Sequence, residues 1–539
     1  MQPPNGMPQR IYRRDPYVHG SAEWATAQHL KERHYGEDGR LPLGYLPAEH
    51  IKTKQTLIAT SIKAHILQIG ATRSGKGISG SVPICLTHMG SMVCAAPKDG
   101  EQAEIAAVYR RDVLGHLTCL IDPEDRVASR RGFNCSGFNP LIHLDPKSPD
   151  FFDDAMLIGE AIVETNDKDK FWSNEAKALI AGLCMHIRTC PQSLLPNPRG
   201  ARDLGQVRDC LNLPPKQFKE LISGAFSKEE EDGKEKIILV TPGMAQSRNR
   251  FVRAAAGRIQ NKAAKELSGV ISTAQVNTHF LESPRNRTVL SKNDYHPDML
   301  ANGNTSVFLI ISTAKISTDN RLVRLFVSWS LRCVSRFETK PNPPVLFQLE
   351  EMGTSLGYLR EVEIAVGLMA GYGLVLHMII QDLSQLKSLY PSWETFIANC
   401  GVIQVSGVND LFTAEYLSKL CGTTTIESLS EVSAAMRAGL FTDPEYTSSL
   451  DHYVSRPLIT PDEFRSLHPA VQVLILANAN PVICYKSCYF LDALYRDRKG
   501  KPLYSIHPHY ADQPVYKGVD FTKPGLNIEK LLEPVFFGT

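Results

Sequence analysis

The chain has 539 residues, of which 43% are hydrophobic, and its formal net charge is +2. This length allows roughly two to four domains with sizeable cores, and the near-neutral charge neither requires nor excludes a nucleic-acid partner. The 12 cysteines include no C-x-x-C pair, which argues against a zinc ribbon or a disulfide framework and favours a reducing compartment. No secretory signal and no run of about 18 apolar residues is present, so we expect a soluble chain.

The first 60 residues combine an arm with a small lead-in element. Residues 1 to about 18 are rich in proline and polar side chains, which predicts an extended arm. The stretch that follows predicts a short helix over Ala22–Glu32, a turn at Glu37–Arg40 and a small strand element in the LPLGYL segment.

From residue 61 to residue 148, strand-like segments alternate with helical ones. A strand at His65–Ile69 precedes a glycine-bounded loop and a helix. Further strands are expected at Ser91–Ala95 and Leu117–Ile121, with a helix over Glu101–Leu114 between them. Strands that alternate with helices indicate a parallel sheet with crossover helices, so these residues form the first part of an α/β domain.

The alternation stops near Leu141, and residues 149–298 have a helical pattern. Apolar positions recur there at helical spacing and β-branched runs are scarce, which predicts an all-α domain inserted into the α/β domain. Within it, the highly charged segment Lys228–Lys236 is most simply a solvated loop. The expected helices are Asp153–Thr165, Trp172–Arg188, Pro215–Phe226, Arg248–Leu267 and Gly269–Phe280.

Strand signals resume in residues 299–490, which form the second part of the α/β domain. Long helices are expected between these strands, the first over Asp319–Phe337. The tail at 491–539 is polar and contains several prolines, which predicts a second arm. The expected strands are Thr305–Ile311, Val345–Leu349, Leu374–Ile380, Val402–Ser406, Val471–Leu476 and Val482–Cys484.

The loop after the strand at His65–Ile69 has the spacing of a phosphate-binding loop, G-x-x-x-x-G-K, from Gly70 to Lys76. Glycines let successive backbone N–H groups turn toward a polyphosphate, the helix N-terminus adds positive potential, and the lysine reaches the outer phosphates. The alternative is a surface turn rich in small residues. We predict a nucleotide site, with Lys76 also acting in catalysis, made by Gly70, Ala71, Thr72, Arg73, Ser74, Gly75, Lys76 and Gly77.

A phosphate-loop ATPase also needs an apolar strand beside the first that ends in acids, which hold magnesium and activate the attacking water. The segment VLFQLEE, Val345–Glu351, fits this description. Here Glu351 is the candidate general base, and Glu350 is the candidate magnesium ligand, acting through water. The alternative is an ordinary strand followed by a polar turn.

Gln381 is a third candidate, because it ends another apolar strand. In a parallel sheet, adjacent strand ends share one edge, where ligands bind. The Gln381 amide could therefore contact the γ-phosphate or the attacking water. It could equally be a polar residue that starts a helix.

A basic run in the expected insert has two interpretations. It could contact DNA phosphates or an acidic partner, or it could be a solvated helix face, which is the simpler interpretation. The run has no acid between its first and last members, which are Arg248, Arg250, Arg253, Arg258, Lys262 and Lys265.

In its motifs the chain resembles the coupling proteins of type IV secretion and conjugation systems, of the TraG/TraD type. The resemblance runs from about residue 19 to about residue 490. The matching pieces occur in order along the chain. They are HGSAEWA at His19–Ala25, GATRSGKG at Gly70–Gly77, APKDGE at Ala96–Glu101, FNPL at Phe138–Leu141, FW from Phe171, FQLEEMGTSLG at Phe347–Gly357, GYG at Gly371–Gly373, QDLSQL at Gln381–Leu386 and RPLITPDEF at Arg456–Phe464.

This resemblance implies a RecA-like P-loop NTPase domain with an inserted all-α domain, with ATP and Mg²⁺ as cofactors. It implies a homo-hexameric ring with nucleotide at the subunit interfaces. It also implies a bacterial cytoplasmic protein at the inner membrane. The implied partners are components of the type IV secretion channel and a relaxase–DNA complex, single-stranded DNA or effector proteins.

Several features depart from the family pattern. The family typically begins with transmembrane helices, so this chain is a truncated piece, a member without membrane helices, or one that depends on a separate membrane-anchoring protein. Glu350 stands where the family usually has Asp, and Ala370 stands where many members carry a basic residue proposed to act across the subunit interface. Gly77 replaces the usual hydroxyl residue after the lysine, but glycine is common there in this family. Together these changes favour slow hydrolysis, or hydrolysis only in an assembled ring.

The leading hypothesis is a coupling ATPase that recruits relaxase-bound single-stranded DNA, effector proteins or both, and delivers them to a type IV secretion channel. A second hypothesis is a substrate receptor or adaptor whose nucleotide site is mainly structural. A third is a double-stranded DNA translocase, which is weaker because the insert and the segment Arg456–Phe464 fit coupling proteins better.

Overall fold

The computed structural model describes residues 17, 19–36, 41–46, 56–61, 64–96, 99–164, 170–231, 234–429 and 451–489. The expected arm at the N-terminus, the turn at Glu37–Arg40 and the expected C-terminal tail fall almost wholly outside these residues. The short N-terminal helix, α1, spans Ala27–Glu32 and is shorter than expected, because Thr26 caps it by accepting a hydrogen bond from the His29 amide.

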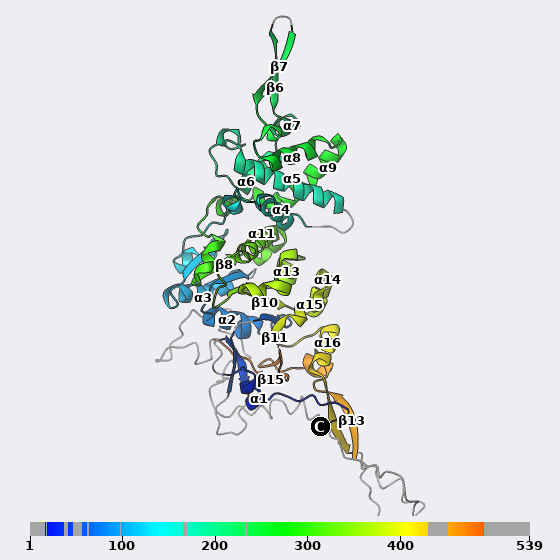
Figure 1. Ribbon diagram of the computed structural model, residues 1–539. Helices are drawn as coiled ribbons and strands as arrows, with labels where there is room; N and C mark the ends of the chain where they lie inside the picture. The colour runs from blue at the N-terminus through cyan, green and yellow to red at the C-terminus, as the bar shows by residue number, and fades with distance from the viewer. Residues whose placement is uncertain are drawn as a thin grey trace, which may run out of the picture.

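One large sheet forms the centre of the described chain (Figure 1). From β11 to β5 its strands pair in parallel, as predicted, and beyond β11 the sheet continues through antiparallel pairs. In order across the described sheet the strands are β2 (Thr56–Thr60), β1 (Leu41–Leu46), β15 (Val482–Tyr485), β14 (Val471–Leu476), β11 (Cys400–Val405), β3 (His65–Ile69), β10 (Leu374–Ile380), β9 (Val345–Leu349), β4 (Met92–Ala96), β8 (Thr305–Ile310) and β5 (Leu117–Ile121).

The parallel strands are buried on both faces, because helices cover both faces of this part of the sheet. Side chains alternate between the two faces, so Phe347 packs in one hydrophobic cluster and its neighbour Leu346 in the other. The helices of the α/β domain are α2 (Val82–Thr87) and α3 (Glu101–Asp112) on the Leu346 side, and α11 (Ile316–Val334), α12 (Met352–Ser355), α13 (Arg360–Leu368), α14 (Leu383–Leu389), α15 (Trp393–Ala398) and α16 (Leu411–Cys421) on the Phe347 side.

The predicted insert lies between β5 and β8 in the chain and is mainly helical. Its helices sit above the sheet in Figure 1. We call residues 151–291 the helical insert. Its helices are α4 (Phe151–Ile162), α5 (Lys170–Thr189), α6 (Leu204–Leu211), α7 (Pro215–Ser223), α8 (Arg250–Gln260), α9 (Ala264–Asn277) and α10 (Pro284–Ser291).

The expectation of a solvated loop at Lys228–Lys236 is wrong, and so the insert is not purely helical. Strands β6 (Ala225–Glu231) and β7 (Lys234–Thr241) pair as an antiparallel hairpin, with a register shift between Ala225 and Phe226. Acidic and basic residues fill Lys228–Lys236. The β-branched and apolar residues that favour a strand lie mainly after this segment, in the second half of β7. The hairpin projects beyond α7 at one end of the molecule (Figure 1).

A second hairpin at the opposite end was not predicted. Strands β12 (Thr423–Leu429) and β13 (Asp451–Pro457) pair antiparallel, and the short helix α17 (Pro461–Arg465) follows them. Helix α17 begins with a capping box in which Thr460 and Glu463 satisfy each other's backbone N–H groups.

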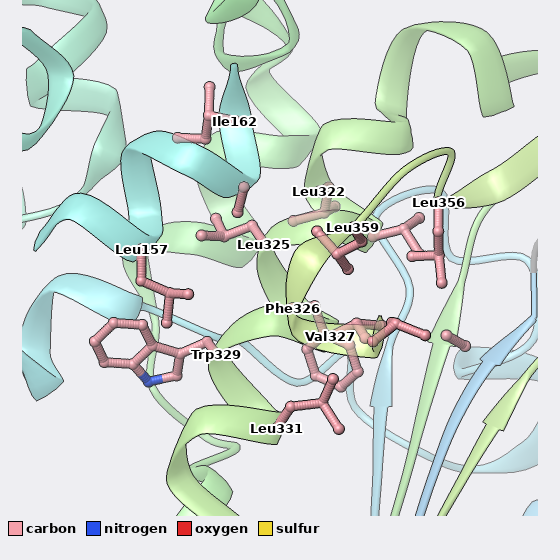
Figure 2. Packing of buried hydrophobic residues seen from close by; sticks show 14 of the residues in the cluster. Leu157, Ile162, Leu322, Leu325, Phe326, Val327, Trp329, Leu331, Leu356 and Leu359 are labelled. Carbon is pink, nitrogen blue, oxygen red and sulfur yellow. The ribbon is translucent and has the colours of Figure 1, made fainter. Parts of the chain in front are cut away.

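Helix α11 joins the helical insert to the sheet. Figure 2 shows its apolar side chains packed against Leu157 and Ile162 of α4 and against Leu356 and Leu359, which follow the end of β9. Arg324 of the same helix is buried and donates hydrogen bonds to the carbonyls of Ala161 at 2.9 Å, Leu356 at 2.6 Å and Tyr358 at 2.7 Å. One arginine therefore links α4 to the chain that leaves β9.

The helix after the loop at Gly70–Lys76 packs very closely on the sheet. It starts as a π-helical turn, Gly77–Ser81, and continues as α2. The amide of Gln68 in β3 donates to the Lys76 carbonyl at 3.0 Å, and a Cβ on Gly80 would lie 2.3 Å from the same amide nitrogen. Glycine at this position therefore allows the helix to approach the strand.

We predict that Phe326→Ala lowers the free energy of unfolding by about 3–5 kcal/mol, because it leaves a cavity in the core. Phe326 is fully buried, and its ring lies 5.4 Å from that of Phe138 and 5.5 Å from that of Tyr295. Denaturant or thermal unfolding measures the change. Val276→Ala on exposed α9 is the control and should stay within about 0.5 kcal/mol. Equal effects of the two changes would contradict the packing described here.

We predict opposite effects of alanine at two helical glycines. Gly80→Ala should destabilise by about 1–3 kcal/mol, because it displaces the buried Gln68 side chain. Gly257→Ala in α8 should stabilise by roughly 0.5–1 kcal/mol, because its Cβ meets no atom within 4 Å. The midpoint of denaturant unfolding measures both, and a Gly80→Ala protein as stable as the wild type would contradict the close approach.

Candidate functional site

The carboxyl ends of four neighbouring strands meet at one edge of the sheet. Ile69 of β3 pairs with Ile380 of β10 on one side and with Val405 of β11 on the other, and Leu349 of β9 pairs with Met378. The residues that follow these strands therefore come together, as expected for Gln381. The acid-bearing strand does not lie beside β3, however, because β10 is inserted between them. Strand order depends on long-range packing, which local sequence does not encode.

The predicted nucleotide-binding residues form a tight loop between β3 and the π-helical turn. The Gly70 amide donates to the Ile380 carbonyl at 3.3 Å, and the Ala71 amide donates to the Gly407 carbonyl at 3.0 Å. Arg73 has a φ of 65° and Gly75 a φ of 87°, so the backbone turns through the left-handed region twice. Such a turn directs successive amides to one side, which is the geometry of an anion cradle.

Lys76 is folded over the loop and is only 5% exposed. Its ammonium group donates to the carbonyls of Gly70 and, at 3.3 Å, of Ile380. The side chain thus lies at the shared strand edge, where a phosphate in the cradle could take over these contacts. This position agrees with its predicted role.

Glu350 is fully buried directly after β9. One of its carboxylate oxygens, Oε1, accepts hydrogen bonds from the Ser81 hydroxyl, from Gln102 Nε2 at 3.0 Å and from Gln348 Nε2 at 3.4 Å. Ser81 belongs to the π-helical turn, so its hydroxyl reaches the carboxylate from the helix that carries Gly77. The carboxylate is therefore held in place by three side chains.

Glu351 and Gln381 contact each other. Glu351 has a φ of 47°, and Gln381 Nε2 donates to its Oε2 at 3.0 Å. A non-glycine residue in this region carries strain of roughly 1–3 kcal/mol, and such strain is commonly retained at functional sites. This backbone conformation directs the Glu351 carboxylate toward Gln381 at the end of β10.

Sequence reasoning did not identify Ser81, Gln102 or Gln68 as parts of this site. Ser81 and Gln102 bind Glu350, and Gln68 binds the Lys76 carbonyl. A signal existed for two of them, because Ser81 lies on the helix after the loop and Gln102 directly follows the APKDGE segment. The contact with Glu350 depends on the packing of three separate elements, which no local pattern indicates.

The residues present fit a nucleotide with Mg²⁺. The Ser74 hydroxyl is buried and has no hydrogen-bond partner in the described part of the chain, and a Cβ on Gly70 would lie 2.5 Å from it, so only glycine fits at position 70. Among the described residues, no group of three or more His, Cys, Asp or Glu side chains could hold a metal ion. Mg²⁺ commonly needs only one or two carboxylates when phosphate oxygens and waters complete its shell, which suits Glu350.

The basic run of the helical insert is partly neutralised. Arg258 pairs with Glu175 at 2.5 Å, and Lys262 pairs with Glu175 at 2.9 Å and with Glu266 at 2.6 Å. Arg250 instead lies over the ring of Phe251, at 4.5 Å from its centre. Two of the six basic residues, Arg258 and Lys262, are therefore neutralised by ion pairs within the helical insert.

No helix among the described residues combines the length and the apolar character that crossing a bilayer requires.

Solved structures share the fold. The plasmid coupling protein TrwB, in complex with the non-hydrolysable ATP analogue ADPNP, matches with a TM-score of 0.58 at 14% identity, over 88% of this chain and 96% of that chain. The unbound TrwBdeltaN70 also matches with a TM-score of 0.58, over 86% of this chain and 91% of that chain. The expected α/β fold, a RecA-like P-loop domain with a helical insert, is confirmed.

Sequence comparison identifies the family. The conjugal transfer protein TraG of Escherichia coli is 25% identical over 533 residues, which cover 90% of this chain and 79% of that protein. The type IV secretion system-coupling protein VirD4 of Bartonella quintana is 24% identical, over 79% of this chain but only 63% of its own length. A family model for conjugative DNA transfer by the type IV secretory system matches residues 24–511. The chain therefore belongs to the type IV secretory system conjugative DNA transfer family.

Proposed function

We propose that the chain is a coupling ATPase that recruits substrates and delivers them to a type IV secretion channel. The observation that carries this proposal is the meeting of Lys76, Glu351 and Gln381 at one edge of the sheet. In this proposal ATP is bound by the loop from Gly70 to Gly77, and Glu350 holds Mg²⁺ through water. Bound ATP supplies the phosphoryl group whose transfer to water drives transport.

The roles of the side chains follow from their positions. Lys76 binds the outer phosphates and stabilises the charge that develops on them. Glu351 accepts a proton from the attacking water, and the amide of Gln381 holds the Glu351 carboxylate in the orientation that this step needs. Lys76 belongs to the loop, and Glu351 and Gln381 follow the neighbouring strands β9 and β10. In this proposal, ATP binding and hydrolysis therefore take place at the same edge of the sheet.

The proposed partners follow from the family. They are type IV channel components, together with a relaxase bound to single-stranded DNA or effector proteins as cargo. We also propose a homo-hexamer as the active form, and a location at the cytoplasmic face of the inner membrane. Mass spectrometry of co-purified partners tests the cargo, because a relaxase indicates DNA transfer and toxins indicate effector delivery.

One observation favours a second candidate, a substrate receptor with a mainly structural nucleotide site. Glu350 is fully buried and bound by three side chains, so it has limited freedom to rearrange around a metal. Ala370 in addition supplies no cation at the position before Gly371–Gly373. Turnover measured with and without DNA and partner proteins separates the candidates, and vigorous hydrolysis by the wild type that Glu351→Gln abolishes would exclude the receptor.

We predict that Lys76→Ala abolishes measurable ATP binding, because it removes the ammonium group that is folded over the loop. Glu351→Gln should keep ATP binding but lower the hydrolysis rate about 10²–10⁴-fold, because the general base is lost. Titration with a fluorescent ATP analogue and a phosphate-release assay measure the two effects. The controls are Lys419→Ala and Glu415→Gln, which change exposed residues of α16. Tight binding by Lys76→Ala would refute the site.

A further inference from the structure

A buried lysine from another part of the chain contacts the outside of the phosphate-binding loop. Lys486 directly follows β15, and it is fully buried. Its ammonium donates to the carbonyls of Ser74 at 2.8 Å, Ser406 at 3.1 Å and Pro469 at 2.8 Å. An ammonium has three N–H donors, so these three carbonyls satisfy it completely.

Among the described residues, no carboxylate forms an ion pair with the charge of Lys486. Burial lowers the pKa of Lys486 to about 7, and the ionisable groups coupled to it are Cys484 on its own strand and His468 just before β14. A buried charge without a counter-charge is costly, so packing alone does not account for a lysine here.

The position of the three carbonyls indicates what the lysine does. Ser74 lies in the phosphate-binding loop, Ser406 ends β11 beside β3, and Pro469 precedes β14. When the amides of a loop turn inward toward an anion, its carbonyls turn outward. Lys486 therefore holds the outward face of the loop against the ends of two other strands. The hydroxyls of Ser74 and Ser406 are both buried and have no hydrogen-bond partner among the residues that the structure describes, and both residues lie against Gly70.

We propose that Lys486 is a positioning residue of the nucleotide site. Its ammonium binds the Ser74 carbonyl, keeps the loop amides directed at the phosphates and adds a buried positive charge that bound polyphosphate balances. The inference rests on the proposed function, because it requires that the loop binds nucleotide. Lys486 does not touch the nucleotide in this arrangement and acts through Ser74.

The test compares the affinity for a fluorescent ATP analogue, with Mg²⁺ in excess, among variants of the full chain. Lys486→Met removes the donors and the charge, and Lys486→Gln keeps two amide donors without the charge. Both should weaken binding by at least about tenfold, the effect of losing one hydrogen bond that involves a charged group. Lys486→Arg keeps the charge and should bind more tightly than both. Lys419→Met on the exposed face of α16 is the matched control and should bind like the wild type.

Thermal unfolding without nucleotide separates positioning from stability. A stabilising role alone would lower the melting temperature of Lys486→Met and Lys486→Gln and leave the affinity of the folded protein unchanged, and the arginine variant would bind no better than they do. Affinities of the folded variants within about twofold of the wild type would overturn the inference. If Lys486→Met does not fold, Lys486→Gln decides the matter. The Lys76→Ala variant tests the proposed function separately. If it binds the ATP analogue as tightly as the wild type, the proposed nucleotide site itself is refuted, whatever the Lys486 variants show.

Discussion

The shared edge of four parallel strands is the constraint on which the site depends. The ends of β11, β3, β10 and β9 are held in register by backbone pairing, so the residues after them have fixed relative positions. The loop is attached to this edge at several points. The Gly70 amide and the Lys76 ammonium both bind the Ile380 carbonyl, and the Ala71 amide binds the chain after β11. A shift of any one strand would separate the carboxylates from the loop.

Hydrogen bonds from neighbouring side chains hold the acidic residues of the site. Glu350 is bound by a hydroxyl and two amides, and Glu351 by the Gln381 amide. Buried carboxylates require such partners, because an unpaired charge away from water is costly. Gly77 has no hydroxyl group, but Ser81, one turn later on the same helix, has one, and it binds the Glu350 carboxylate.

The helical insert connects to the same region, since Arg324 of α11 joins α4 to the chain after β9.

Local patterns in the sequence were sufficient for much of the fold. Continuous apolar runs such as Val345–Leu349 and Leu374–Ile380 predict buried parallel strands because both faces of these strands are covered, and their bounds agree with the structure. The insert was predicted less completely, because the expected helix Arg248–Leu267 is divided between α8 and α9, and α6 and α10 were not expected. The hairpin at β6 and β7 was missed, because charged residues dominate the sequence of Lys228–Lys236 and no apolar alternation marks the strands there.

The amino-acid sequence by itself determined the loop motif, the acidic strand end and the family, because each depends on residues that are adjacent in the chain. Only the tertiary structure decided that β10 separates β3 from β9, that Ser81 and Gln102 bind Glu350, and that Lys486 reaches the loop. These contacts join residues up to 412 positions apart. They arise from the order in which strands pair and from the packing of helices on them, and both of these depend on the whole core and not on any one segment.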